Sequence, residues 1–247
     1  MAIGAIAHQR VIRDLKSKEY SGDFSISQNG QLMFGLPVPE MDIKFSEVRP
    51  CSYSQAKSVI MEYEWLGTMA QRTTHTFGIF YDNQIAGAVC FALPPTPQAA
   101  SGVAGDDYAN NVKTLARGAC VWWAHPHSAS KLISGALNWM CKNTRFRYFV
   151  AYSDERAGEI GTVYQATNWL YTGKTSGDTE YFIDGEWRSG RTARHKSYIN
   201  KGINYKDCPS RKGHPKHRYV FIGGRKDEKR ELRKMLRYPV LSYPKRK

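Results

Sequence analysis

The chain has 247 residues, enough for one large domain with a sizeable buried core, and its 41% hydrophobic content excludes a disordered protein. No apolar run approaches the roughly 18 residues of a membrane span, and the N-terminus lacks the pattern of a secretory signal, so we expect no membrane association. Five widely spaced cysteines favour buried thiols in a reducing cytoplasm over a disulfide framework.

The net charge of +14 is concentrated at one end of the chain. Residues 191–247 hold 19 Lys and Arg against 4 Asp and Glu, whereas residues 1–190 hold 17 against 18. Each cation beside a phosphate releases counterions, so a basic segment with interleaved aromatics is typical of a surface that contacts a polyanion. A solvated tail is the alternative. The predicted phosphate-contacting residues are Arg191, Arg194, Lys196, Arg211, Lys212, Lys216 and Arg218.

In chain order, residues 1–40 form an N-terminal extension of mixed pattern that ends in a turn-rich stretch. Alternating or continuous apolar runs then predict strands at 41–49, 74–82, 85–93, 112–124, 146–154, 179–187 and 218–225. Helical spacing and capping signals predict helices at 52–67, 128–143, 159–173 and 227–237. The Pro- and Gly-rich segment 94–111 is predicted to be an irregular loop.

This order predicts an α/β (α+β) domain over residues 41–240, with a mixed central sheet and helices on both faces. A basic DNA-contacting insertion is expected at about 188–218 and a basic tail at 241–247. The order is similar to that of the GNAT N-acyltransferases. That resemblance implies a site for acetyl-CoA or a related acyl-CoA at Arg117, Ser128, Ser130 and Lys131, although the usual GNAT phosphate loop is absent after Trp123.

The most specific motif lies in residues 152–173. Ser153-Asp154 is followed by Gly161-Thr-Val-Tyr164-Gln-Ala-Thr-Asn168-Trp169, a run that resembles the phage Mom family. The resemblance covers roughly residues 41–240. It implies a phage-encoded enzyme of the host cytoplasm that converts adenine in duplex DNA to N6-(carbamoylmethyl)adenine and protects the phage from restriction.

Three residues of this motif are catalytic candidates. Asp154, where a strand runs into a loop, is predicted to accept a proton or a hydrogen bond from the exocyclic amine, or alternatively to cap a helix. Tyr164 matches the position of the GNAT tyrosine that protonates a leaving thiolate, and its alternative is a core role. Asn168 is expected on the same helix face as Tyr164, where it would bond a base edge or a cofactor amide. Because adenine is stacked and paired, the enzyme must extrude it from the duplex.

Histidines provide a weaker metal hypothesis. His75, His125 and His127 are candidates for a catalytic metal site, and Cys208, His214 and His217 for a structural zinc. Neither set has the spacing of a known zinc motif, so the metal requirement stays open.

Other functions remain as alternatives. A GNAT acetyltransferase acting on a protein or small amine would explain the core, but not the basic C-terminal part. A non-catalytic phage DNA-binding protein would explain the basic part, but not the motif around Asp154 and Tyr164. A metal-dependent nuclease would need paired carboxylates or an HNH-like array, which we do not find. The sequence does not indicate an oligomeric state.

Overall fold

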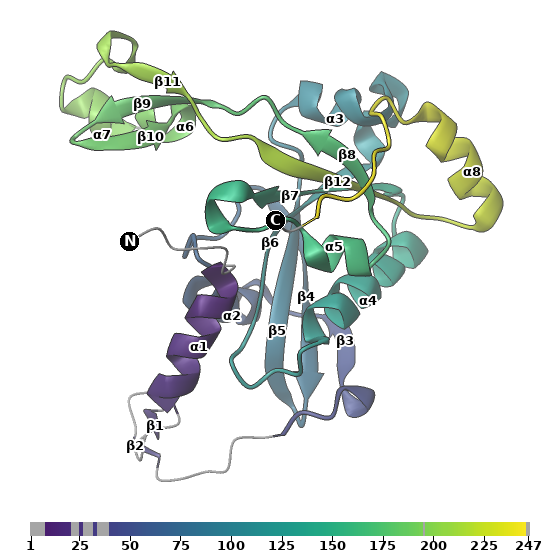
Figure 1. The fold of residues 1–247 in the computed structure, drawn as a ribbon. Coiled ribbons are helices and arrows are strands. Elements are labelled where there is room, and N and C mark those ends of the chain that lie inside the picture. The colour runs from purple at the N-terminus through teal and green to yellow at the C-terminus, as the bar shows by residue number, and fades with distance from the viewer. Residues whose placement is uncertain (1–7, 21–24, 27–31, 34–39, 195, 246–247) are drawn as a thin grey trace.

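The structure is a computed structural model that describes residues 8–20, 25–26, 32–33, 40–194 and 196–245. Its centre is a seven-stranded sheet with the order β3-β4-β5-β6-β7-β12-β8 (Figure 1). Neighbouring strands are antiparallel, except that β6 and β7 run parallel. The strands are β3 (Glu47–Pro50), β4 (Thr73–Tyr81), β5 (Gln84–Ala92), β6 (Val112–Cys120), β7 (Tyr148–Asp154), β8 (Leu170–Lys174) and β12 (Lys216–Ile222).

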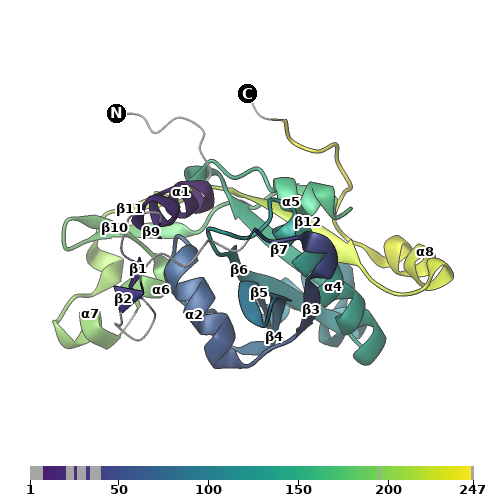
Figure 2. The same ribbon diagram turned by 90° about the horizontal axis from the view of Figure 1, so that it is seen from below.

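Helices cover both faces of this sheet, which confirms the predicted fold class (Figure 2). Trp139 of α4 meets Phe77 of β4 edge-on, with ring centroids 5.3 Å apart, and Phe149 of β7 lies in the same core cluster. A second cluster around Tyr148 and Val220 receives residues of α3 and α8. The helices are α2 (Tyr53–Tyr63), α3 (Pro97–Ala104), α4 (Ser128–Asn143), α5 (Thr162–Ala166) and α8 (Lys226–Met235), with 3-10 turns η1 (Ile43–Phe45), η2 (Asp106–Asn111) and η3 (Glu155–Ala157).

Local signals explain where the helices begin. Ser52 caps α2, and its side chain and that of Gln55 satisfy each other's backbone N–H groups. The prediction of an irregular loop over 94–111 is wrong, because Thr96 caps α3 and Pro97 occupies its first position. At the first position of a helix, a proline favours the start of the helix, whereas in the interior it would interrupt it.

The predicted helix over 159–173 is wrong in its second half. α5 ends at Ala166, because Asn168 adopts a left-handed φ of 60°, and the chain then extends into the edge strand β8. The predicted strand over 179–187 does not join the central sheet. It forms a hairpin of β9 (Thr179–Ile183) and β10 (Glu186–Ser189), turned at Asp184 and Gly185, whose positive φ angles suit a tight hairpin turn.

The hairpin belongs to an arm, residues 175–215, that projects from the body at the upper left of Figure 1. β11 (Ser210–Lys212) pairs with β9, so the arm has its own three-stranded sheet of order β10-β9-β11. Its helical turns are α6 (Gly190–Ala193), α7 (Lys196–Asn200) and η4 (Tyr205–Asp207). The arm spans most of the predicted basic insertion.

The N-terminal helix α1 (His8–Tyr20) is docked on the body, and two short strands follow it, β1 (Ser25–Ile26) and β2 (Leu32–Met33). Gln9 Nε2 donates to the carbonyl of Gly118 on β6 at 2.8 Å, and Arg13 donates to the carbonyl of Ala124 at 3.0 Å. At the other terminus, Leu241 N donates to Tyr171 O of β8. Within the described residues, no helix combines the length and the apolar character needed to cross a bilayer.

Candidate active site

The parallel strands β6 and β7 are paired over only part of their length. Pairing joins Val112–Leu115 to Tyr148–Ala151, although β6 continues to Cys120 and β7 to Asp154. The strands part beyond this point, and we call the opening between them the splay. Ser153, on the β7 side, has a buried Oγ without a hydrogen-bond partner in the described part of the chain. The carboxyl ends of adjacent parallel strands are where α/β sheets bind ligands.

Ionisable side chains from separate elements gather at the splay. Glu64 ends α2 and its carboxylate lies 3.9 Å from Arg117 Nε of β6, while Glu159 follows η3 and Tyr164 lies on α5. The charges of Glu64 and Glu159 both act on Tyr164. We call Glu64, Arg117, Asp154, Glu159 and Tyr164 the splay cluster.

Glu159 is the residue of the splay cluster best suited to exchange a proton. Burial, and then the negative charges of Glu64 and Asp154, raise the pKa of Glu159 to about 7. A carboxyl with a pKa near the working pH can act as a general base or acid. Sequence reasoning missed Glu159. The available signal was its place inside the 152–173 motif, shortly before Tyr164.

Tyr164 is held by aromatic neighbours. Its ring centroid lies 5.2 Å from that of Trp169 and 5.3 Å from that of Tyr219. Gly161, with φ of 72°, makes this packing possible, because a Cβ at that position would overlap the Tyr219 ring. Burial, followed by the charge of Glu159, raises the pKa of Tyr164 above its usual value. The hydroxyl therefore keeps its proton at neutral pH and is available as a donor.

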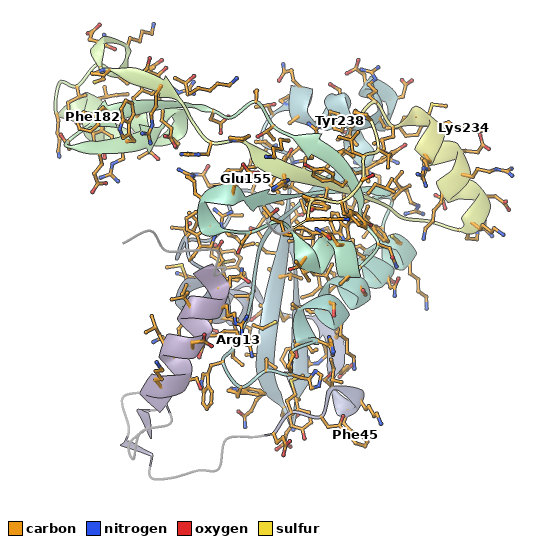
Figure 3. All side chains as sticks on the ribbon, viewed as in Figure 1. Arg13, Phe45, Glu155, Phe182, Lys234 and Tyr238 are labelled. Carbon is orange, nitrogen blue, oxygen red and sulfur yellow. The ribbon has the colours of Figure 1, made fainter. Side chains whose placement is uncertain are left out.

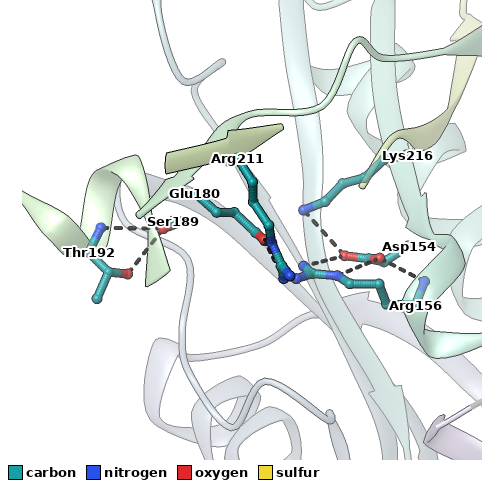
Figure 4. A network of polar contacts seen from close by, with 7 residues as sticks. All are labelled: Asp154, Arg156, Glu180, Ser189, Thr192, Arg211 and Lys216. Carbon is teal, nitrogen blue, oxygen red and sulfur yellow. Dashed lines mark hydrogen bonds and ion pairs between the residues drawn. The ribbon is translucent and has the colours of Figure 1, made fainter. Parts of the chain in front are cut away.

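Asp154 is committed to a polar network (Figure 4). It caps η3 by accepting from Arg156 N at 3.0 Å, and its two carboxylate oxygens accept from the Arg156 guanidinium at 3.2 and 3.0 Å. Burial alone would raise the pKa of Asp154, but the hydrogen bonds from Arg156 and the charge of Lys216 outweigh it and lower this pKa. A base role for Asp154 stays a prediction, and the low pKa makes the carboxylate a weak proton acceptor at neutral pH.

The same network fastens the arm to the body. The buried Glu180 of β9 pairs with Arg156 at 3.0 Å and with Arg211 of β11 at 2.9 Å. Lys216 completes the chain of alternating charges, with its Nζ 3.6 Å from Asp154. The root of the arm is therefore fixed to the β7 side of the splay (Figure 4).

Asn168 lies in a different place from the one expected. The expectation that it shares the helix face of Tyr164 is wrong, because α5 ends before it and its backbone is left-handed. Its exposed side chain instead lines a groove of about 410 Å³. The other residues of this groove are Ser134, Leu137, Asn138, Thr167, Leu170, Phe221, Ile222, Lys229 and Arg233. A contact of Asn168 with a base or a cofactor stays a prediction.

Two of the predicted cofactor-binding side chains are engaged within the protein. Lys131 Nζ donates to the carbonyls of Ile43 and Ser46 at 2.6 and 2.7 Å, which fixes η1 against α4. The buried Ser128 Oγ donates to Met41 Sδ at 3.4 Å. A cofactor phosphate at this place would therefore be bound by the backbone N–H groups of the α4 N-terminus rather than by these side chains.

The other two predicted cofactor-binding residues lie on β6 and on α4, on either side of the loop that joins these elements. Ser130 Oγ donates to the carbonyl of His127 in the first turn of α4. Arg117 donates to the carbonyl of Thr68 at 3.0 Å and belongs to the splay cluster. The structure thus places Arg117, but not Ser130, among the ionisable groups of the splay. Cofactor binding by either residue stays a prediction.

A joint metal site of His75 with His125 and His127 is wrong. His75 packs edge-on against Phe146, beyond the C-terminal end of α4, whereas His127 caps the N-terminal end. The 16 residues of α4 separate those ends by about 24 Å. The described residues contain no group of three or more His, Cys, Asp or Glu that could hold a metal.

The predicted zinc residues are also dispersed. The buried His217 of β12 contacts Tyr171 Oη at 2.9 Å and Glu155 at 3.0 Å. Cys208 bonds the carbonyl of Asn204 inside the arm, and His214 is exposed.

The predicted phosphate-contacting residues fall into two groups. Arg194, Arg211 and Lys212 are exposed on the arm. Arg218 and Lys216 are partly buried: Arg218 bonds the hydroxyl and carbonyl of Thr172, and Lys216 pairs with Asp154. The side chains of Arg191 and Lys196 lie outside the described part. Phosphate contact by any of these residues stays a prediction.

The strand order and the splay together define an α/β protein of the GNAT-like fold class. A model of the Mom protein family matches residues 46–245, and the chain belongs to this family. The match covers both the splay and the arm. Among curated protein sequences, none matches the chain.

Solved structures of acetyltransferases are similar in fold. An N-acetyltransferase from Staphylococcus aureus Mu50 is 8% identical, with 72% of this chain and 97% of that chain covered and a TM-score of 0.42. The ribosomal-protein-S5-alanine acetyltransferase from Vibrio fischeri is 11% identical, with 74% and 95% covered and a TM-score of 0.43. A GNAT family acetyltransferase from Elizabethkingia anophelis with acetyl-CoA bound is 9% identical, with 72% and 99% covered and a TM-score of 0.42.

Proposed function

We propose that the protein is a phage DNA-modification enzyme that converts adenine in duplex DNA to N6-(carbamoylmethyl)adenine and thereby protects phage DNA from host restriction. One observation carries the proposal: membership of the Mom family extends over residues 46–245, which include the splay cluster and the arm. The basic C-terminal part supports DNA as the substrate, since residues 191–247 hold 19 Lys and Arg against 4 Asp and Glu.

The splay cluster supplies the proton chemistry that this reaction needs. The exocyclic amine of adenine is a weak nucleophile that must lose a proton as its new N–C bond forms. Glu159, with a pKa raised to about 7, accepts that proton. Tyr164, which is protonated at neutral pH, donates a hydrogen bond to the leaving group, and because its pKa is raised it passes on the proton only as that group becomes strongly basic. Asp154 stays ionised and holds Arg156 and the root of the arm in position.

We infer that an acyl-CoA or a related donor binds at the splay. The residues present fit such a group in two respects. The buried Ser153 Oγ has no partner within the described residues and offers a hydrogen bond to an amide-bearing ligand. The N-terminus of α4 follows β6 and favours a phosphate through its backbone N–H groups. Acyl transfer from a thioester would place a carbonyl carbon on N6, so the carbamoylmethyl product requires that the bound donor present a methylene carbon to the amine and carry the leaving group on that carbon.

The direct test is the composition of DNA from cells that express the protein. Nucleosides from digested DNA are weighed, with a Glu159→Gln variant as the matched control. We expect a deoxyadenosine that carries a carbamoylmethyl group in place of one hydrogen, formed with the wild type and not with the variant. Unmodified DNA together with acetylated protein would instead support a GNAT acetyltransferase acting on protein.

A further inference from the structure

The arm exposes an aromatic pair. Phe182 of β9 and Trp187 of β10 are direct partners in the hairpin register, with ring centroids 5.3 Å apart. Their exposed fractions are 40% and 37%, high for two large aromatic side chains in contact. Figure 3 shows Phe182 on the projecting arm, away from the central sheet. The two rings therefore offer apolar surface to a partner.

The pair is not the hydrophobic core of the arm. Side chains alternate along a strand, so Phe182 shares a face with Glu180, and Tyr181 and Ile183 point to the opposite face. On that opposite face Ile183 is buried, and Tyr181 meets Tyr205 edge-on at 5.1 Å. The arm therefore has its apolar packing on one side and presents the aromatic pair on the other.

One cation lies directly against the aromatic pair, and the arm that carries the pair is basic. The guanidinium of Arg211 lies over the Trp187 ring, 4.2 Å from its centroid. Residues 179–212 hold eight Lys and Arg against four Asp and Glu. DNA complements this surface in both respects, because its phosphates attract the cations, and its base faces can stack on aromatic rings where a base step is unstacked.

The aromatic face is also tied to the splay. Glu180 and Phe182 lie on the same face of β9, two positions apart, which is about 6.6 Å along a strand. Glu180 bonds Arg156, which in turn bonds Asp154 of the splay cluster. These ion pairs thus fix the position of the aromatic pair relative to the splay cluster, which would react with the adenine.

We propose that Phe182 and Trp187 form a wedge that enters the duplex beside the target adenine and stacks in the space the extruded base leaves. The exposed cations of the arm, such as Lys206 and Lys212, bind the flanking phosphates. Apolar wedges unstack base steps at a cost of a few kcal/mol, and extrusion has a similar cost. The wedge rests on the proposed function, since it explains how a paired base reaches the splay.

The test uses the full-length protein and duplexes in which 2-aminopurine, a fluorescent adenine analogue, replaces adenine at successive positions. No donor is added. We expect the wild type to raise the fluorescence severalfold at a subset of positions, and Phe182→Thr and Trp187→Thr to lose that rise. Threonine keeps the strand propensity and removes the ring. Phe45→Thr is the matched control, since Phe45 is 80% exposed on η1 at the far end of the body (Figure 3).

Further measurements separate a wedge from a structural role. Trp187→Phe should restore the fluorescence rise, and thermal melting with limited proteolysis of the arm should match the wild type in each variant. Threonine variants that raise fluorescence as the wild type does would overturn the wedge. So would a wild type that binds duplexes without any rise, or variants whose only defect is in self-association or in binding anionic vesicles.

This readout is independent of the chemistry. A fluorescence rise without any new deoxyadenosine derivative would contradict the proposed reaction and leave the wedge standing. Adenine modification that continues unchanged in both threonine variants would contradict the wedge and leave the proposed reaction standing.

Discussion

Asp154 and Lys216 are direct partners in the register of β7 and β12, and Lys216 Nζ lies 3.6 Å from the Asp154 carboxylate. Because Arg156 holds the same carboxylate, two cations from different elements converge on one buried anion. The arrangement places a strong structural constraint on a residue for which the sequence had suggested either catalysis or a capping role.

Asp154→Asn should lower the free energy of unfolding by about 2 kcal/mol. This is less than for a fully buried pair, because both cations are partly exposed. The low pKa of Asp154 means that its stabilisation is present above the pKa of an unfolded aspartate and is lost as pH falls through the folded value. Urea melts of wild type and variant should therefore converge in acid. Asp82→Asn, in an exposed turn, is the control. Unchanged stability with lost modification would restore Asp154 as the proton acceptor.

Glu159→Gln should abolish modification and remove a pH dependence of stability. The pKa of Glu159 is raised to about 7, so its carboxyl is protonated in the folded protein where an unfolded glutamate is ionised. Its contribution is fully present below the unfolded pKa and is lost as pH rises through about 7. The melting temperature of the wild type should fall relative to the variant between pH 5 and 8. Glu40→Gln, at an exposed position, is the control substitution, and parallel curves for wild type and Glu159→Gln would show that Glu159 titrates normally.

Tyr164→Phe should keep a cooperative melt and lose on the order of a hundredfold or more in modification rate. The ring contacts with Trp169 and Tyr219 remain, whereas the proton donor is gone. Tyr219→Phe is the contrasting variant. Its hydroxyl donates to Ile160 O at 2.5 Å, so its loss should cost about 1 kcal/mol of stability and little activity. A Tyr164→Phe protein that modifies DNA at the wild-type rate would exclude the acid role.

Lys206→Ala combined with Lys212→Ala should reduce the salt dependence of duplex binding by about two units of slope, equally for all sequences. Both lysines are exposed on the arm, whereas Arg218 is bonded to Thr172 and is a poorer choice. Binding is measured between 50 and 200 mM salt, where six to eight phosphate contacts imply about a thousandfold loss of affinity. Lys44→Ala with Lys57→Ala, exposed on the body, should leave the slope unchanged. An unaltered slope in the arm variant would place the DNA elsewhere.

The sequence predicted those parts of the fold that depend on local periodicity. The helix over 128–143 appears with the predicted bounds, because its apolar spacing and its buried face coincide. α3 and β8 were missed because each depends on a single backbone signal, a proline at a helix start and a left-handed asparagine at a helix end. The arm was misassigned because a strand pattern does not show which sheet the strand will join.

The site was predictable only in part for a related reason. Tyr164 was identified from its motif, but the pKa of Glu159 depends on the burial and charge that Glu64 and Asp154 create around it. Glu64 lies at the C-terminal end of α2, far away in the sequence, and comes near Glu159 only through the tertiary fold. Similarly, no local pattern shows that Arg218 bonds Thr172 or that Lys131 bonds η1.

The docking of α1 has a consequence for solubility. Val121 N of the segment after β6 donates to Ala86 O, so alternate residues bond β5 and the carbonyl of Gly118 points the other way, into the splay. Gln9 of α1 caps that carbonyl with a side-chain donor. An open strand edge is a template on which strands of other molecules add, and this polar cap blunts it. α1 therefore covers part of the stretch of β6 that β7 leaves unpaired and hinders the addition of a strand from another molecule there.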